Sequence, residues 1–127
     1  MYEPYAVTVY DAHNIFAKIL RKEIHTKIIL ETDHSLAFHD AFPKAPIHAL
    51  VIPKGNYTDL HDFCKKASKP EVIDFWQTVH RTIEALNMEQ DGYRMISNSG
   101  INGGQEIPHF HVHLCGGIKL SPMTVKQ

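Results

Sequence analysis

Three histidines alternate with apolar residues near the end of the chain, in the stretch His109-Phe110-His111-Val112-His113-Leu114. Alternate side chains of a β-strand point to the same face, so the sequence predicts that the three imidazoles share one face of a strand. The apolar residues between them would face the core. Neighbouring imidazoles disfavour each other's protonation, and stability alone therefore gives no reason to collect them. The pattern favours a chemical role.

Two chemistries suit such a strand. Neutral imidazoles two residues apart can ligate one Zn²⁺ and leave a fourth position open for catalysis. Alternatively, one imidazole acts as a nucleophile toward phosphorus, with its other ring nitrogen held as a donor by a backbone carbonyl and its neighbours protonating the leaving group. The preceding loop carries Gly100, Gly103 and Gly104, whose backbone N–H groups can approach an anion closely. This loop favours the nucleophile over the metal site.

The histidine strand is expected to belong to an antiparallel sheet. Predicted strands cover about residues 27–30, 35–39, 47–52, 93–97 and 108–115, and residues 1–10 have the period-two pattern of a short strand or an ordered arm. One predicted helix begins at Asp11 as N-cap and ends near Lys22. The other begins at the capping box of Ser68 and Glu71 and buries an apolar stripe formed by Val72, Trp76, Val79, Ile83 and Leu86. Because the order contains no repeated βαβ unit, the sequence predicts an α+β fold with five antiparallel strands and two helices.

Composition limits the class of protein. The 127 residues are enough for one domain over 1–127, and the 43% apolar content is that of a globular chain. A net charge of −1 argues against affinity for nucleic acid. We also expect no association with a membrane, because no apolar run approaches the roughly 20 residues of a membrane span. Residues 1–17 contain no Lys or Arg, unlike a signal peptide, which favours a cytoplasmic location.

The stretch from Gly103 to Gly117 closely resembles the signature of the histidine triad (HIT) family, and specifically its branch of small nucleotide-binding phosphoramidases. Further segments resemble the family in the family's order, so that the resemblance covers about residues 13–117; they lie at 14–19, 37–40, 45–48, 51–54 and 92–95. The resemblance implies a HIT-like fold and a homodimer whose sheets pair edge to edge. Pairing would also cover an exposed sheet edge.

The resemblance further implies a nucleotide site. His111 would be the nucleophile that takes the nucleoside monophosphate covalently, and His113 would lie near the scissile bridging atom. His109 and His48 would support the orientation and protonation of the site. Asp40 would receive both ribose hydroxyls. The base and sugar would be surrounded by Phe16, Ile19, Phe38 and His39, and the phosphate and leaving group would be contacted by Asn98, Gly104, Gln105 and Glu106.

Structural alternatives exist for several of these residues. Phe16, Ile19 and Phe38 lie on apolar faces and would suit a core in any fold. Asp40 could start a turn, and Asn98 could cap the glycine loop.

The implied activity is hydrolysis of purine nucleoside phosphoramidates or aminoacyl adenylates, releasing the nucleoside monophosphate and requiring no metal or other cofactor. The alternative is a slow or non-catalytic nucleotide-binding scaffold. Many relatives carry a Cys-x-x-Cys pair that helps to bind a structural zinc. Asn14 and Ala17 stand at those two positions here, so no zinc is predicted there.

Overall fold

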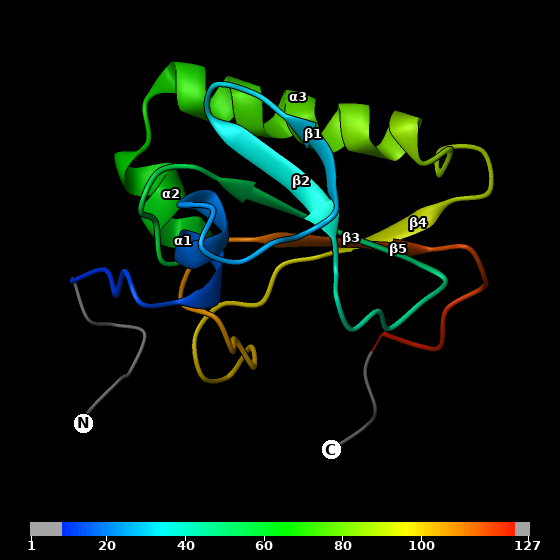
Figure 1. Ribbon diagram of the computed structural model, residues 1–127. Coiled ribbons are helices and arrows are strands. Elements are labelled where there is room, and N and C mark those ends of the chain that lie inside the picture. Colours follow the sequence, from blue (N-terminus) through cyan, green and yellow to red (C-terminus); the bar gives the residue numbers. More distant parts are fainter. Residues whose placement is uncertain (1–8, 124–127) are drawn as a thin grey trace.

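Five antiparallel strands form one sheet in the order β1-β2-β3-β5-β4 (Figure 1). The computed structural model describes residues 9–123. The elements are α1 (Ile15–Leu20), β1 (Ile28–Glu31), β2 (Ser35–His39), β3 (Ile47–Pro53), α2 (Leu60–Lys66), α3 (Lys69–Ala85), β4 (Tyr93–Ile96) and β5 (Val112–Gly116). The predicted α+β class and its five antiparallel strands are confirmed. The pattern seen in residues 1–10 lies almost wholly outside the described residues.

Residues 9–123 form three helices, and the prediction of two was wrong. Helix α2 was missed because its seven residues bury only Phe63 and therefore carry no apolar stripe. Asp59 is its N-cap and accepts the Asp62 backbone N–H at 2.8 Å. The start of α1 was also misplaced. Asn14, rather than Asp11, caps this helix, and its side-chain oxygen accepts the Ala17 backbone N–H at 2.9 Å.

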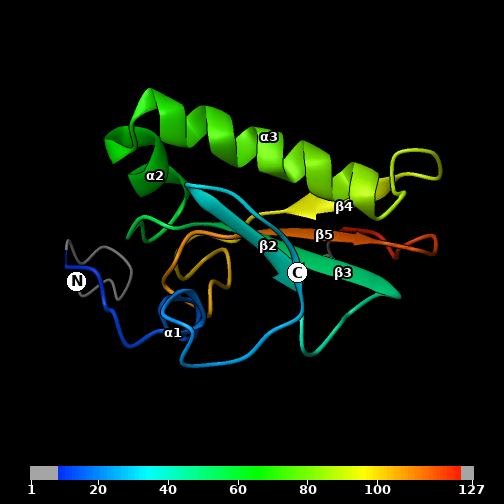
Figure 2. The ribbon, with the colours of Figure 1, turned by 45° about the horizontal axis from the view of Figure 1, so that its top comes forward.

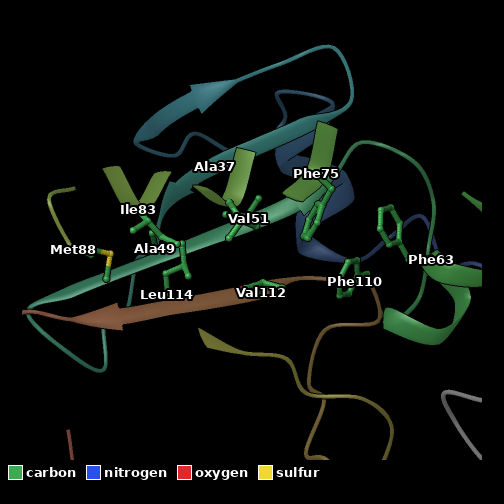
Figure 3. Packing of buried hydrophobic residues seen from close by; sticks show 11 residues of the cluster. Ala37, Ala49, Val51, Phe63, Phe75, Ile83, Met88, Phe110, Val112 and Leu114 are labelled. Atoms are coloured by element: carbon green, nitrogen blue, oxygen red, sulfur yellow. The ribbon is translucent and has the colours of Figure 1, made fainter. Parts of the chain in front are cut away.

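Helix α3 crosses one face of the sheet and encloses the main core. The predicted capping box of Ser68 and Glu71 is present at its start. Phe75 and Ile83 of α3, and Met88 of the loop between α3 and β4, pack against small and branched residues of the sheet. Figure 3 shows these sheet residues, Ala49, Val51, Val112 and Leu114. Trp76 was expected in this core but is 38% exposed. The neighbouring Phe75 is fully buried in its place, with the Trp76 ring against its edge.

A smaller core lies on the opposite face of the sheet, under α1. Phe16 and Ile19 pack there against Leu36, Phe38 and Leu50. Helices α1 and α3 lie on opposite sides of the sheet, and the loop between β4 and β5 is on the α1 side (Figures 1 and 2). No helix within residues 9–123 is both long and apolar enough to cross a membrane. The glycine loop and the residues that lead into β5 therefore lie on the same face of the sheet as α1.

Candidate functional site

A cavity of about 340 Å³ opens on the α1 face of the sheet. Its apolar end is formed mainly by α1 and β2, and its polar end by the β2–β3 connection, the glycine loop and the start of β5. Most of the predicted site residues line it, namely Phe16, Ile19, Phe38, Asp40, His48, Asn98, Gly104, Glu106, His111 and His113. Residues from distant parts of the chain thus meet around one space with an apolar and a polar end, as a small amphiphilic ligand requires.

Three predicted site residues do not line the cavity: His39, Gln105 and His109. His39 is exposed at the end of β2, next to the inward-facing Phe38. Gln105 is buried and holds the loop, because its side chain accepts the Gly100 N–H at 3.0 Å and donates to the Thr58 carbonyl at 2.7 Å. Gln105 thus holds the glycine loop in place without lining the cavity itself.

His109 is completely buried. Its Nε2 lies 2.8 Å from the Pro53 carbonyl and must donate to it, since a carbonyl only accepts. Burial lowers the pKa of His109 to about 4, so the ring is neutral near pH 7 and its Nδ1 is an acceptor. The Tyr10 hydroxyl is the partner of that nitrogen. Both ring nitrogens are therefore already hydrogen-bonded within the protein.

His111 lines the cavity, and among the described residues only one of its ring nitrogens has a hydrogen-bond partner. Its Nδ1 donates to the His109 backbone carbonyl at 2.7 Å, and burial lowers its pKa. A neutral imidazole with its proton on Nδ1 keeps a free electron pair on Nε2. The rings of Phe16 and His113 each lie with their centroids 4.9 Å from that of His111. Its Nε2 can therefore act as a nucleophile.

His113 is held by His48, which comes from β3. The Lys44 backbone N–H donates to His48 Nδ1 at 3.0 Å, so the proton of this ring is on Nε2. That Nε2 donates to His113 Nδ1 at 2.9 Å, which leaves the proton of His113 on its own Nε2. Burial lowers the pKa of both rings, that of His113 to about 4. A backbone amide thus determines which nitrogen of His113 is a donor.

The arrangement does not suit a resident metal ion. Within residues 9–123, the group with ligand atoms close enough together is Asp40, His48 and His113, all within 4.8 Å. To ligate a metal, His48 Nε2 would have to lose its proton to Nδ1, where it would face the Lys44 N–H. His109 and His111 are not in this group. The three-histidine zinc site is therefore not formed, because both ring nitrogens of His109 are hydrogen-bonded, one to the Pro53 carbonyl and the other to the Tyr10 hydroxyl.

Asp40 has a turn role and also reaches the cavity. One of its carboxylate oxygens accepts the Phe42 backbone N–H at 2.7 Å, as an aspartate at the start of a turn does. The other lies 3.5 Å from His48 Nε2. Asn98 likewise lines the cavity while its side chain donates to the Gly103 carbonyl at 2.7 Å. Each residue thus keeps free acceptor capacity at the cavity.

Several lining residues were not predicted. His25 and Thr26 border the cavity from the segment that follows α1, and Lys44 borders it beside His48. His25 and Thr26 gave no signal in the sequence because they lie in a segment without regular periodicity. Among the described residues that line the cavity, Lys44 supplies the positive charge of a lysine or arginine side chain. Asp40 and Glu106 supply negative charge.

Comparison with known proteins places the chain among relatives of similar length. A 13.2 kDa HIT-like protein of Azospirillum brasilense is 46% identical over 117 residues, covering 92% of this chain and 96% of the relative. The purine nucleoside phosphoramidase of Escherichia coli K12 is 40% identical over 114 residues, covering 89% of this chain and 94% of the enzyme.

Solved structures show the same fold. A histidine triad protein from Clostridium difficile superimposes with a TM-score of 0.79 at 33% identity, covering 91% of this chain and 100% of the other. A HIT family hydrolase from Clostridium thermocellum gives a TM-score of 0.76 at 31% identity, covering 89% and 97%. The sequence pattern of the HIT domain itself matches residues 21–120. With its histidine strand, fold and relatives in agreement, the chain belongs to the HIT family.

Proposed function

We propose that this protein hydrolyses purine nucleoside phosphoramidates or aminoacyl adenylates through a nucleotidyl intermediate on His111. The observation that carries the proposal is the hydrogen bond from His111 Nδ1 to the His109 carbonyl at 2.7 Å. It leaves an unprotonated Nε2 on a residue that lines the cavity. Because the electron pair on His111 Nε2 is already available, this nucleophile requires no metal and no separate activating group.

The cavity suits a nucleoside monophosphate in one orientation. The base would lie at the apolar end against Phe16, Ile19 and Phe38, which line the cavity and belong to the smaller core. Asp40 would accept the ribose hydroxyls. The phosphate would then lie at the polar end beside His111 and the glycine loop, where Asn98, Gly104 and Glu106 line the wall.

The proposed reaction has two displacements. His111 Nε2 forms a bond to phosphorus, while the bond from phosphorus to the amine nitrogen breaks and its electron pair stays on nitrogen. That nitrogen takes a proton from Nε2 of a His113 ring that has gained a second proton beside the phosphate anion, so that the ring is left neutral. A water molecule then attacks phosphorus and returns a proton to His113, the bond to His111 breaks, and the nucleoside monophosphate leaves. Burial opposes positive charge on His113, whereas the bound phosphate anion would favour it.

The relatives support this choice of substrate. The similar protein from E. coli is named a purine nucleoside phosphoramidase, and a similar protein from C. thermocellum is named a HIT family hydrolase. We also propose that the protein is located in the cytoplasm and that residues 1–127 form a single domain.

We further propose that the active form is a homodimer. Strands β1 and β4 are the two edges of the sheet, and β4 exposes the apolar side chains of Tyr93 and Met95. An uncovered edge with apolar side chains is suited to pairing with a second copy of the chain.

Turnover of a fluorogenic adenosine phosphoramidate tests the enzyme directly. His111→Gly should abolish turnover and keep AMP affinity within about tenfold, because base and ribose contacts remain. His61→Ala, in exposed α2, is the control for loss of a histidine. A His111→Gly variant with a tenth of the wild-type rate would refute the covalent mechanism. Tight AMP binding by a wild-type protein without turnover would favour the scaffold.

A further inference from the structure

The segment before α1 contacts the first histidine of the triad. We infer that Tyr10 and Asn14 are positioning residues for the His111 nucleophile and that they act on it through His109. This inference rests on the proposed function of His111. Neither Tyr10 nor Asn14 lines the cavity, so neither touches the substrate.

The contacts form a continuous chain of hydrogen bonds. Asn14 Nδ2 donates to the Tyr10 hydroxyl oxygen at 2.8 Å, and that hydroxyl bonds to His109 Nδ1. The Tyr10 and His109 rings meet edge to face, with centroids 5.6 Å apart. Asn14 is itself fixed, because it is buried and caps α1 through its other side-chain atom. Helix α1 and the triad are thereby joined without a strand between them.

Each hydrogen bond has a fixed direction. His109 Nε2 donates to Pro53, so in the neutral ring Nδ1 accepts and Tyr10 must donate to it. The Tyr10 oxygen then accepts from Asn14. Burial raises the pKa of Tyr10, so the hydroxyl keeps the proton that this chain requires. In the series Asn14, Tyr10, His109 and Pro53, each group donates to the next. Reversing the direction of one hydrogen bond would therefore leave another without a donor.

The position of His111 depends on this chain because the ladder of β5 begins only at Val112. The His109 carbonyl, which fixes the proton on His111 Nδ1, therefore lies outside the ladder. Its residue is held by its backbone N–H on the Ile107 carbonyl at 2.9 Å and by its ring between Tyr10 and Pro53. The peptide that contains the carbonyl is also held by the Phe110 N–H, which donates to the Tyr57 carbonyl at 2.8 Å. Removing the Tyr10 bond releases one side of the ring, so that fewer contacts hold the residue whose carbonyl orients the nucleophile.

Asn14→Asp separates positioning from helix capping. Aspartate keeps the oxygen that caps α1 but cannot donate to Tyr10, and its carboxylate competes with His109 for the Tyr10 proton. It also loses the bond from Asn14 Nδ2 to the Asp11 carbonyl at 2.8 Å, which Tyr10→Phe leaves in place. Tyr10→Phe removes the hydroxyl directly. Ser68→Ala removes the N-cap of α3, on the opposite face of the sheet, and is the control for loss of a cap.

Two measurements are made on each variant: kcat and KM for the adenosine phosphoramidate, and the ¹⁵N shifts of the histidine ring nitrogens. Asn14→Asp and Tyr10→Phe should lower kcat by about tenfold or more with KM within about twofold, because the nucleophile is misplaced while the cavity is intact. In the spectra, His111 should change from one Nδ1-protonated tautomer to a mixture. Ser68→Ala should change neither kcat nor the tautomer, whatever its effect on the unfolding temperature.

The ring spectra do not depend on turnover, so the two proposals can fail separately. If both variants keep the wild-type kcat and a single His111 tautomer, the positioning role is refuted. If the wild-type protein has no turnover but the variants still change the His111 tautomer, the positioning role holds and the proposed function fails. A change of tautomer in Ser68→Ala equal to that in Asn14→Asp would also refute the inference, because it would show a general loss of stability.

Discussion

Replacing His109 by asparagine removes a completely buried imidazole and should change how stability depends on pH. In the folded protein burial lowers the pKa of His109 to about 4, from an ordinary value of 6.5. Between these two values the unfolded chain binds a proton that the folded protein does not bind. The stabilisation is therefore fully present above about pH 6.5 and is lost as the pH falls toward 4.

The size of the effect follows from the two pKa values of His109, about 4 and 6.5. At about 1.4 kcal/mol per pH unit, the full window corresponds to about 3 kcal/mol of unfolding free energy. Between pH 7 and pH 5 the loss should be about 2 kcal/mol, because most of the unfolded chain is already protonated at pH 5.

Urea unfolding at pH 7 and at pH 5 measures this loss. The fall in unfolding free energy between the two pH values should be smaller in His109→Asn than in the wild type by about 2 kcal/mol. The comparison within each protein cancels the packing cost of the substitution. His61→Asn, at an exposed position of α2, should lose as much as the wild type. Equal losses in His109→Asn and the wild type would show that His109 is not held neutral by burial.

Three further outcomes are expected. AMP should bind more tightly than its 2′-deoxy form by about tenfold to a hundredfold, because a hydrogen bond to a charged group contributes about 1.5–3 kcal/mol, and Asp40→Ala should remove this preference. Calorimetry of both ligands with both proteins measures it, and a preference that survives in Asp40→Ala would place ribose recognition elsewhere. Activity should survive exhaustive EDTA treatment, because His48 Nε2 is already a hydrogen-bond donor; stoichiometric zinc whose removal abolishes activity would contradict this. Light scattering at micromolar concentration should give about twice the 14.5 kDa of one chain, and a mass near 14.5 kDa would refute the dimer.

The five strands could be predicted because local composition decides them. Apolar and β-branched runs bounded by residues such as Asp33, Pro43 and Pro53 mark strands β1 to β3. Helix α2 could not be predicted in the same way, because a helix that buries one residue has no periodicity to detect. The start of β5 was misplaced for a related reason. The alternating pattern begins at His109, whereas the ladder begins at Val112, where a partner on β3 becomes available.

The sequence by itself determined that three histidines alternate beside a glycine loop and that the fold is an antiparallel α+β one. It also determined which residue types are available to a nucleotide. Only the tertiary structure decided which ring nitrogen carries each proton. The proton of His111 is set by the carbonyl of His109, and those of His109, His48 and His113 depend on Tyr10, Pro53 and Lys44. Tyr10 lies 99 residues from the histidine that it contacts. Sequence patterns report propensities over a few neighbouring residues, whereas a hydrogen bond between distant segments exists only after packing brings them together.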